Sequence, residues 1–222
     1  MLYYLFGYIK RKRTESSVNN ADQLLERGMK KEALTIYKEL LKKVSGRSGP
    51  VLFSHIKYKE GHCYYNLSLV SNKEDNLTKS IHAFREALKI YTIEKYPVDY
   101  ASTQNNLGKA YGRLSEVRNK EDNLTKSIHA FREALKIYTI EKHPVDYART
   151  QNNLGKAYER LSEVRNKEDN LTKSIHAFEE ALKIYTIEKY PENYRMVKLN
   201  IDFTKKQINS QKYVNLGGAV YN

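Results

Sequence analysis

The chain has 222 residues, of which 40% are hydrophobic, and it contains 19 tyrosines, no tryptophan, 10 glycines and 4 prolines. This balance is typical of a folded helical protein and excludes a disordered chain. The formal net charge is +13, but residues 1–71 hold 13 Lys and Arg against 6 acidic residues and so carry +7 of it. The charge therefore describes one end of the sequence and does not by itself indicate a nucleic-acid-binding surface.

Residues 1–18 form an N-terminal segment with an apolar start and a basic run. The apolar stretch 1–9 is far shorter than the roughly 20 residues that cross a bilayer. Its basic residues 10–13 follow the apolar stretch, whereas a secretory signal places them before it. Aromatic residues beside a basic run are compatible with a peripheral membrane contact through residues 1–13. The alternative is a packed or frayed terminal helix.

Residues 19–49 are predicted to form a short helix pair followed by a linker. Ala21 and Ala33, with Tyr37 and Leu40, have the spacing of packed helical positions. The segment 45–49, Ser-Gly-Arg-Ser-Gly, has the composition of a linker.

Residues 50–191 contain three copies of one long repeat. All four prolines, Pro50, Pro97, Pro144 and Pro191, lie 47 residues apart. Residues 72–118 and 119–165 differ only at Tyr96/His143, Ser102/Arg149 and Gly112/Glu159. A period between 20 and 50 residues predicts a solenoid, in which each repeat packs mainly on its neighbours.

Each long repeat is predicted to contain two helices. One begins after Asp75 and Asn76, which are good N-cap types, and stops before Pro97. Its apolar residues recur at helical spacing, so they should share one buried face: Leu77, Ile81, Phe84, Leu88 and Tyr91. The other helix covers about 98–116, with Leu107, Ala110, Tyr111 and Leu114 on its inner side.

A glycine recurs inside the second helix as Gly61, Gly108 and Gly155. A glycine within a helix costs about 1 kcal/mol relative to alanine. We therefore expect a neighbouring helix to approach these positions too closely for a side chain, with the small residues Ala83 and Ala87 serving the same packing.

At the C-terminal end, residues 192–211 are predicted to form a capping helix and residues 212–222 a flexible tail. Val197 and Ile201, with Phe203 or Ile208, have the spacing of a packed helix face. Asp202 stands where the earlier repeats have glycine, and no partner helix follows. A polar terminal helix of this kind is typical of a cap.

One residue pattern resembles the tetratricopeptide repeat: Leu107-Gly108 and Tyr111 in one helix, Phe84 and Ala87-Leu88 in the companion helix, and Pro97. The phrase from Tyr96 to Leu107 is most similar to the longer repeats of kinesin light chains and of many prokaryotic multidomain proteins. The resemblance covers about 20–210 and implies an all-α fold, a right-handed α-solenoid of stacked antiparallel helix pairs. This sequence departs from the family in its 47-residue period, in having Ser80, Ser127 and Ser174 in place of an alanine, and in having Glu60 in place of a leucine.

The helix after each proline also carries a polar strip. Its members recur at steps of four, which places each set of three on one helical face. The two later repeats carry Asn105, Lys109 and Arg113, and Asn152, Lys156 and Arg160, and these are flanked by Asn106 and Asn153. The first long repeat has Tyr58, His62 and Asn66 in the same positions. The resemblance implies that this strip lines a concave groove and holds a peptide. Amides can pair with an extended backbone and a guanidinium can grip a carboxylate, so an acidic or C-terminal peptide is the expected guest. The alternative is a solvated polar face.

Other patterns predict no chemistry. The histidines at 82, 129 and 176 repeat in register, but successive helices pack 8–10 Å apart, so they cannot converge on one metal, and no metal or cofactor is expected. The Asn-Leu-Thr motifs at 76, 123 and 170 match a glycosylation pattern, although helix capping explains the same asparagines. Cys63 occupies a small packed position, and a single cysteine excludes an intrachain disulfide and fits a reducing compartment, here the cytoplasm.

No catalytic motif is present in the sequence, so we expect a non-enzymatic scaffold that binds a protein or peptide. Two alternatives remain. One is nucleic-acid binding through the basic surface, which the near-identical repeats disfavour because they would read every base alike. The other is a regulatory or sensor part of a larger signalling protein.

Overall fold

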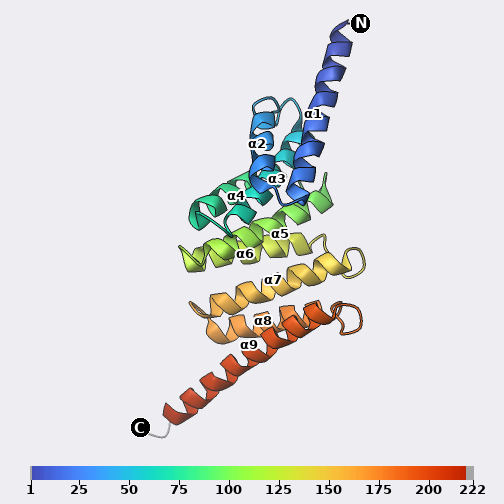
Figure 1. Ribbon diagram of the computed structural model, residues 1–222. Coiled ribbons are helices and arrows are strands. Elements are labelled where there is room, and N and C mark those ends of the chain that lie inside the picture. Colours follow the sequence, from blue (N-terminus) through green and yellow to red (C-terminus); the bar gives the residue numbers. More distant parts are fainter. Residues whose placement is uncertain (1, 219–222) are drawn as a thin grey trace. The chain divides into compact units, whose positions relative to one another are not determined.

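The computed structural model describes the backbone of residues 2–218 and the side chains of residues 12–210. These residues form nine α-helices and no strand (Figure 1), which confirms the all-α prediction. The chain divides within helix α5 into two compact halves, an N-terminal half of residues 1–110 and a C-terminal half of residues 111–222. Within each half, consecutive helices pack on one another, as in an α-solenoid.

The N-terminal half contains α1 (Leu2–Glu26), α2 (Lys30–Leu41), α3 (Pro50–Leu67), α4 (Lys73–Leu88) and the beginning of α5 (Pro97–Leu114). One cluster of buried apolar side chains joins α1, α2 and α3 and includes Ala21, Tyr37, Ile56 and Cys63. Helix α4 adds the buried residues Leu77 and Phe84. Helix α1 begins at Leu2, so the predicted apolar and basic segment and the first helix of the short pair share one helix.

The predicted membrane contact through residues 1–13 rests on side chains that lie outside the described residues, apart from Lys12 and Arg13. Among the described residues, no helix combines the length and the apolar character that crossing a bilayer requires.

The C-terminal half contains the end of α5, then α6 (Lys120–Leu135), α7 (Pro144–Ser162), α8 (Lys167–Leu182) and α9 (Pro191–Gly218). Two apolar clusters hold it together. One joins α6, α7 and α8 around Phe131 and Tyr158, and the other joins α7, α8 and α9 around Phe178 and Ile201.

The helices α4, α6 and α8 begin three or four residues earlier than the sequence predicted. Their N-cap residues are Asn72, Asn119 and Asn166, which have left-handed backbones with φ of 41–44°. Asparagine tolerates this conformation better than most residues. The predicted cap, Asn76, instead lies inside α4, is buried, and donates from Nδ2 to the carbonyl oxygen of Ser71 at 2.7 Å. Asn123 and Asn170 make the same backward contact.

The same helices end well before the prolines. Helix α4 stops at Leu88, so Tyr91, predicted on its packed stripe, lies in the connection that follows. Tyr91 is nevertheless buried, and its ring packs against Tyr96 with centroids 5.7 Å apart. Tyr138 and Tyr185 repeat this arrangement against His143 and Tyr190. In each repeat, the segment between the end of the helix and the proline therefore contributes a buried tyrosine. This tyrosine makes the apolar contact that the sequence assigned to a longer helix.

The predicted close approach at glycine is confirmed at Gly61 and Gly155. A Cβ on Gly61 would lie 2.6 Å from the ring of Phe84, and one on Gly155 would lie 2.6 Å from the ring of Phe178. Gly108 stays a prediction. The carbonyl oxygen of Gly61 also accepts a hydrogen bond from buried Ser80 Oγ at 2.8 Å, whereas Oγ of Ser174, at the equivalent position of a later repeat, is buried without a partner among the described residues.

Helix α9 extends past the predicted boundary at 211 to Gly218, and residues 219–222 lie outside the described part. Val197 and Ile201 are buried as predicted, and Ile208 is half-buried. Phe203, the alternative packed residue, is 56% exposed, so that alternative is wrong. The buried residue at this point is Thr204, because the packed face of α9 passes through positions 197, 201 and 204. Asp202 is exposed, as expected for a terminal helix without a following partner.

Candidate functional site

In the N-terminal half, three predicted strip positions form one polar network. Asn106 Nδ2 donates to the backbone oxygen of Ser102 at 3.0 Å. It also lies 3.1 Å from the hydroxyl oxygen of Tyr58 and from Nε2 of His62, which share its second N–H. The Tyr58 hydroxyl also shares a hydrogen bond of 2.8 Å with Ser102 Oγ. The His62 ring packs edge-on against the rings of Tyr58 and Phe84. This part of the strip is therefore built from side chains that hold one another in place.

The network requires a neutral His62. Because Asn106 Nδ2 can only donate, His62 Nε2 must accept, which places the imidazole proton on Nδ1. Burial, reinforced by the charges of Lys109 and Lys59, lowers the pKa of His62 to about 4. His62 thus stays uncharged at neutral pH and acts as a hydrogen-bond acceptor, not as a cation.

The other predicted residues of this half differ in accessibility. Asn105 is only 5% exposed, so it offers little surface to a partner. Asn66 is half-buried. Lys109 Nζ lies 5.0 Å from the ring centroid of Tyr65, in a cation–π contact.

In the C-terminal half, Arg160 is engaged within the chain. Its Nη1 donates to the carbonyl oxygen of Gly112 at 2.8 Å and to Glu116 Oε1 at 3.1 Å. Its Nη2 donates to Ser115 Oγ at 2.9 Å. These acceptors belong to the C-terminal end of α5 and the turn after it, where a cation is favourable because of the unpaired carbonyls and the helix dipole. The guanidinium predicted to grip a carboxylate is thus already in use.

Two other strip residues of this half carry buried polar atoms without a hydrogen-bond partner among the described residues. They are Nε of Arg113, a donor, and Oδ1 of Asn152, an acceptor. Asn153 and Lys156 are half-buried. Asn200 lies 47 residues after Asn153, and its Nδ2 is also buried without a hydrogen-bond partner among the described residues. Buried polar atoms are nearly always paired in folded proteins, so each of these atoms is a position at which a ligand could complete the hydrogen bonding.

Sequence reasoning missed an apolar stripe on α9. Met196, Leu199 and Phe203 are exposed, the last two by 69% and 56%. Leu199 and Phe203 lie 47 residues after Asn152 and Lys156, so they occupy the strip positions of the last helix. The repeat register could have revealed them, since the polar strip becomes apolar at these two positions.

The structure also locates the side chains for which no chemistry was predicted. His82, His129 and His176 are exposed, each about 4.0 Å from a glutamate one turn further on. In the described part of the chain, no group of three or more metal-binding side chains converges. Asn76, Asn123 and Asn170 are buried, which is incompatible with glycosylation of the folded chain. Cys63 is fully buried, and burial raises the pKa of its thiol to about 12.

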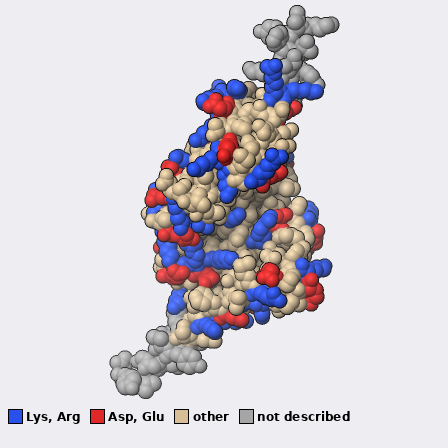
Figure 2. All heavy atoms as spheres, viewed as in Figure 1, with Lys and Arg blue, Asp and Glu red and all other residues tan. Residues whose placement is uncertain are grey.

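Basic and acidic side chains are interspersed on the face seen in Figure 2. Among the described residues, lysine and aspartate one helical turn apart form ion pairs, as in Lys79–Asp75 and Lys126–Asp122, at 2.6 and 2.7 Å. Such exposed pairs contribute little to stability. They do, however, neutralise a share of the net positive charge locally.

Comparison with known proteins agrees with this architecture. The model of the tetratricopeptide repeat family matches residues 61–92. A solved structure, BtubC (BKLC) from P. vanneervenii, is similar with a TM-score of 0.50 and 18% sequence identity, over 94% of this chain and 86% of that one. A search of curated proteins found no match. At this level of identity the likeness concerns the fold alone.

The packed helix pairs, the 47-residue register and the recurring polar strip define a helical repeat protein. The family model matches within α3 and α4, so residues 61–92 resemble a tetratricopeptide repeat, and the solved structure shares the fold of the chain. Repeats of this type generally mediate protein–protein interaction.

Proposed function

We propose that this protein is a non-enzymatic interaction module that holds an extended segment of a partner protein against the polar strip. The observation that carries the proposal is the pair of buried, unpaired polar atoms on predicted strip residues, Arg113 Nε and Asn152 Oδ1. An unsatisfied buried group costs about 1–3 kcal/mol. An extended peptide offers carbonyl oxygens for the former and N–H groups for the latter.

The charge of the strip favours an acidic segment or a free C-terminus. Lys109, Arg113 and Lys156 supply the cations, and charge-assisted hydrogen bonds to a carboxylate are stronger than neutral ones. Arg160 contributes less in this proposal than the sequence suggested, because its guanidinium is engaged at the end of α5. The proposal includes a cytoplasmic location, which the single buried cysteine supports.

A peptide array probed with purified protein tests this proposal. The test variant replaces Lys109, Arg113 and Lys156 with alanine. The control replaces Lys89, Lys136 and Lys183, which are exposed just after the ends of α4, α6 and α8 and pair with nearby glutamates, so that both variants lose three positive charges. We expect the test variant to lose at least about 10-fold in affinity for the captured peptides while the control keeps it. Equal binding by the two variants, with unchanged helical content, would refute the assignment of the strip.

A further inference from the structure

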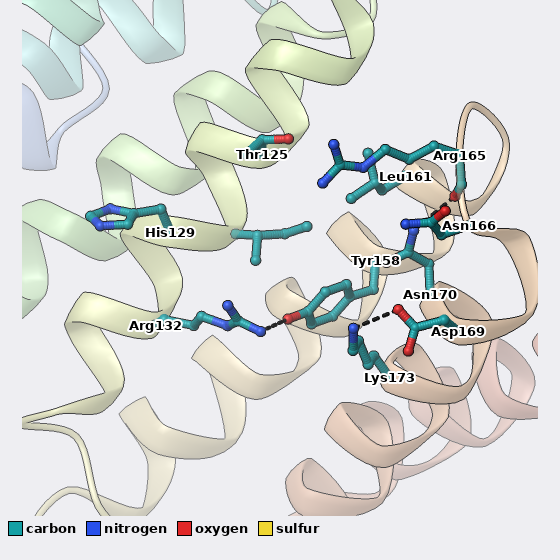
Figure 3. Close-up of a pocket in the computed structure, with 11 residues that line it drawn as sticks. Thr125, His129, Arg132, Tyr158, Leu161, Arg165, Asn166, Asp169, Asn170 and Lys173 are labelled. Carbon is teal, nitrogen blue, oxygen red and sulfur yellow. Dashed lines mark hydrogen bonds and ion pairs between the residues drawn. The ribbon is translucent and has the colours of Figure 1, made fainter.

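A cavity of about 260 Å³ lies in the C-terminal half, among side chains of α6, α7 and α8 and of the turn between the last two (Figure 3). Its charged and aromatic lining consists of Arg132, Tyr158, Arg165, Asp169 and Lys173, with His129 at its edge. None of these residues belongs to the polar strip. The cavity is therefore separate from the polar strip.

Arg132 is held in this cavity by Tyr158. Its guanidinium lies over the tyrosine ring, with Cζ 5.6 Å from the ring centroid, and its Nη2 donates to the tyrosine hydroxyl (Figure 3). Tyr158 is buried and belongs to the apolar cluster of this half, so it is a rigid support. An arginine has five N–H donors, and within the described part of the chain Arg132 uses one of them.

The neighbouring cations are paired, whereas Arg132 is not paired with a carboxylate among the described residues. Lys173 Nζ lies 2.5 Å from Asp169 Oδ2, and Arg165 Nη1 lies 2.9 Å from Glu121 Oε1. Three further arginines of this half, at 149, 160 and 195, also pair with carboxylates. Arg132 thus combines an immobilised guanidinium, open donors and an uncompensated positive charge.

The same arrangement exists in the N-terminal half, at positions two repeats earlier. Lys38, Tyr64 and Lys79 lie 94 residues before Arg132, Tyr158 and Lys173. Lys38 Nζ lies 5.5 Å and Lys79 Nζ 5.8 Å from the ring centroid of Tyr64. Both halves therefore have a tyrosine in contact with a cationic side chain at equivalent positions of the repeat. The contact does not depend on one side-chain conformation.

We infer that the cavity binds a single oxyanion group, a carboxylate or a phosphate monoester of a partner protein, with Arg132 as the principal donor. A planar guanidinium matches two oxygens of such a group with parallel hydrogen bonds. The hydrogen bond to the Tyr158 hydroxyl orders the guanidinium in advance, so less conformational entropy is lost on binding. Lys173 and Arg165 are paired with Asp169 and Glu121, so the unpaired charge of the wall is that of Arg132. A cavity of this size accommodates a side-chain head group but not a long peptide.

The chain provides a safe substitution for testing this inference. Position 179 in α8, 47 residues after Arg132, is Glu179 and is exposed. The variant Arg132→Glu therefore introduces, at an exposed position, the residue that the next repeat has at the equivalent position. We expect this variant to fold. Tyr158→Phe removes only the hydroxyl and keeps the buried ring.

The experiment is an NMR titration of the full chain labelled with ¹⁵N-arginine, in which the Nε–Hε signal of Arg132 is assigned by its loss in Arg132→Glu. Sodium phosphate and sodium acetate are the probes, and sodium chloride at matched ionic strength is the reference. We expect a saturable shift of the Arg132 signal with a dissociation constant on the order of 1 mM, the range open to a few charge-assisted contacts. Tyr158→Phe should weaken binding several-fold, and Arg149→Ala, on the strip-side helix α7, should leave it unchanged.

The two probes separate the sources of the oxyanion. A saturable shift with phosphate alone supports a phosphorylated side chain as the ligand, and saturation with both probes supports a carboxylate as well. The inference is overturned if both probes give the linear drift seen with chloride. The Arg132→Glu variant gives a second test, in which the signals of the other arginines around the cavity are followed. The inference is also overturned if these signals show that the variant binds phosphate with wild-type affinity.

Discussion

The backbone of Gly155 lies directly against the ring of Phe178. A Cβ built on Gly155 would come within 2.6 Å of Cε1 and 2.7 Å of Cδ1 of that ring, and Gly61 and Phe84 repeat the relationship with the same distances. Real Cβ atoms do not approach aromatic carbons this closely. The glycine therefore sets how closely α7 and α8 can pack, in spite of its low helix propensity.

Gly155→Ala should destabilise the protein. Overpacking of this kind costs about 1–3 kcal/mol, whereas the gain in helix propensity is about 1 kcal/mol, so we expect a net loss of up to about 2 kcal/mol and a lower urea midpoint. Gly112→Ala is the matched control, since its Cβ would meet only Ser127 Oγ at 3.3 Å and the next repeat carries Glu159 there. A midpoint for Gly155→Ala equal to or above that of the control would contradict the packing argument.

Stability should fall on mild acidification because of His62. Its pKa is about 4 in the folded protein and about 6.5 when unfolded. Between these values the unfolded chain binds the proton and the native chain does not, so stability is complete above about pH 6.5 and is lost as the pH falls toward 4. The full shift corresponds to about 3 kcal/mol at most, and the half-buried position of His62 reduces this to about 1–2 kcal/mol.

The control for this pH effect is His62→Gln, which can still accept from Asn106 but does not titrate. Urea midpoints are compared at pH 7 and pH 4.5 for both proteins. The protonation of carboxylates lowers the stability of both proteins equally, so the wild type should lose more stability between pH 7 and pH 4.5 than the His62→Gln variant. An identical loss in the two proteins would show that His62 does not titrate with a lowered pKa.

Cys63 should react slowly with a thiol reagent in the native state. The side chain is fully buried and burial raises the pKa of the thiol to about 12, so the reactive thiolate is almost absent at neutral pH. Modification by Ellman's reagent should follow the fraction of unfolded chain as urea is added. Rapid modification without urea, with the circular dichroism spectrum unchanged, is the opposite outcome and would place the thiol at the surface.

Arg160→Ala should lower stability by about 1–2 kcal/mol, because a hydrogen bond to a charged donor contributes about 1.5–3 kcal/mol and exposure reduces that value. The loss reports the contacts with Gly112, Ser115 and Glu116 at the end of α5. Arg195→Ala, which removes an exposed pair with Glu192, should change stability by less than about 0.5 kcal/mol. If Arg160→Ala is as harmless as Arg195→Ala, the capping role is wrong and the guanidinium is available to a ligand.

Much of the fold was predictable from the sequence because its information is local and repeated. The 47-residue register, the apolar spacing of Leu77, Ile81 and Phe84, and the recurrence of glycine at 61 and 155 each depend on helix geometry and on the next helix along the chain. In a repeat fold the next helix is also the packing neighbour. A regular pattern therefore sufficed for helix pairs, buried faces and close approaches.

Tertiary structure alone decided what the polar side chains do. Asn76 reaches back to Ser71, Tyr91 packs in a connection, Arg160 binds the end of α5 44–48 residues earlier, and Arg132 rests on a tyrosine 26 residues later. Helical periodicity places a residue on a face, but it does not say whether a long charged side chain extends into solvent or reaches the neighbouring helix. That choice depends on which acceptors lie within reach after packing, and so the partners of Arg160 and Arg132 could not be read from a pattern of spacing.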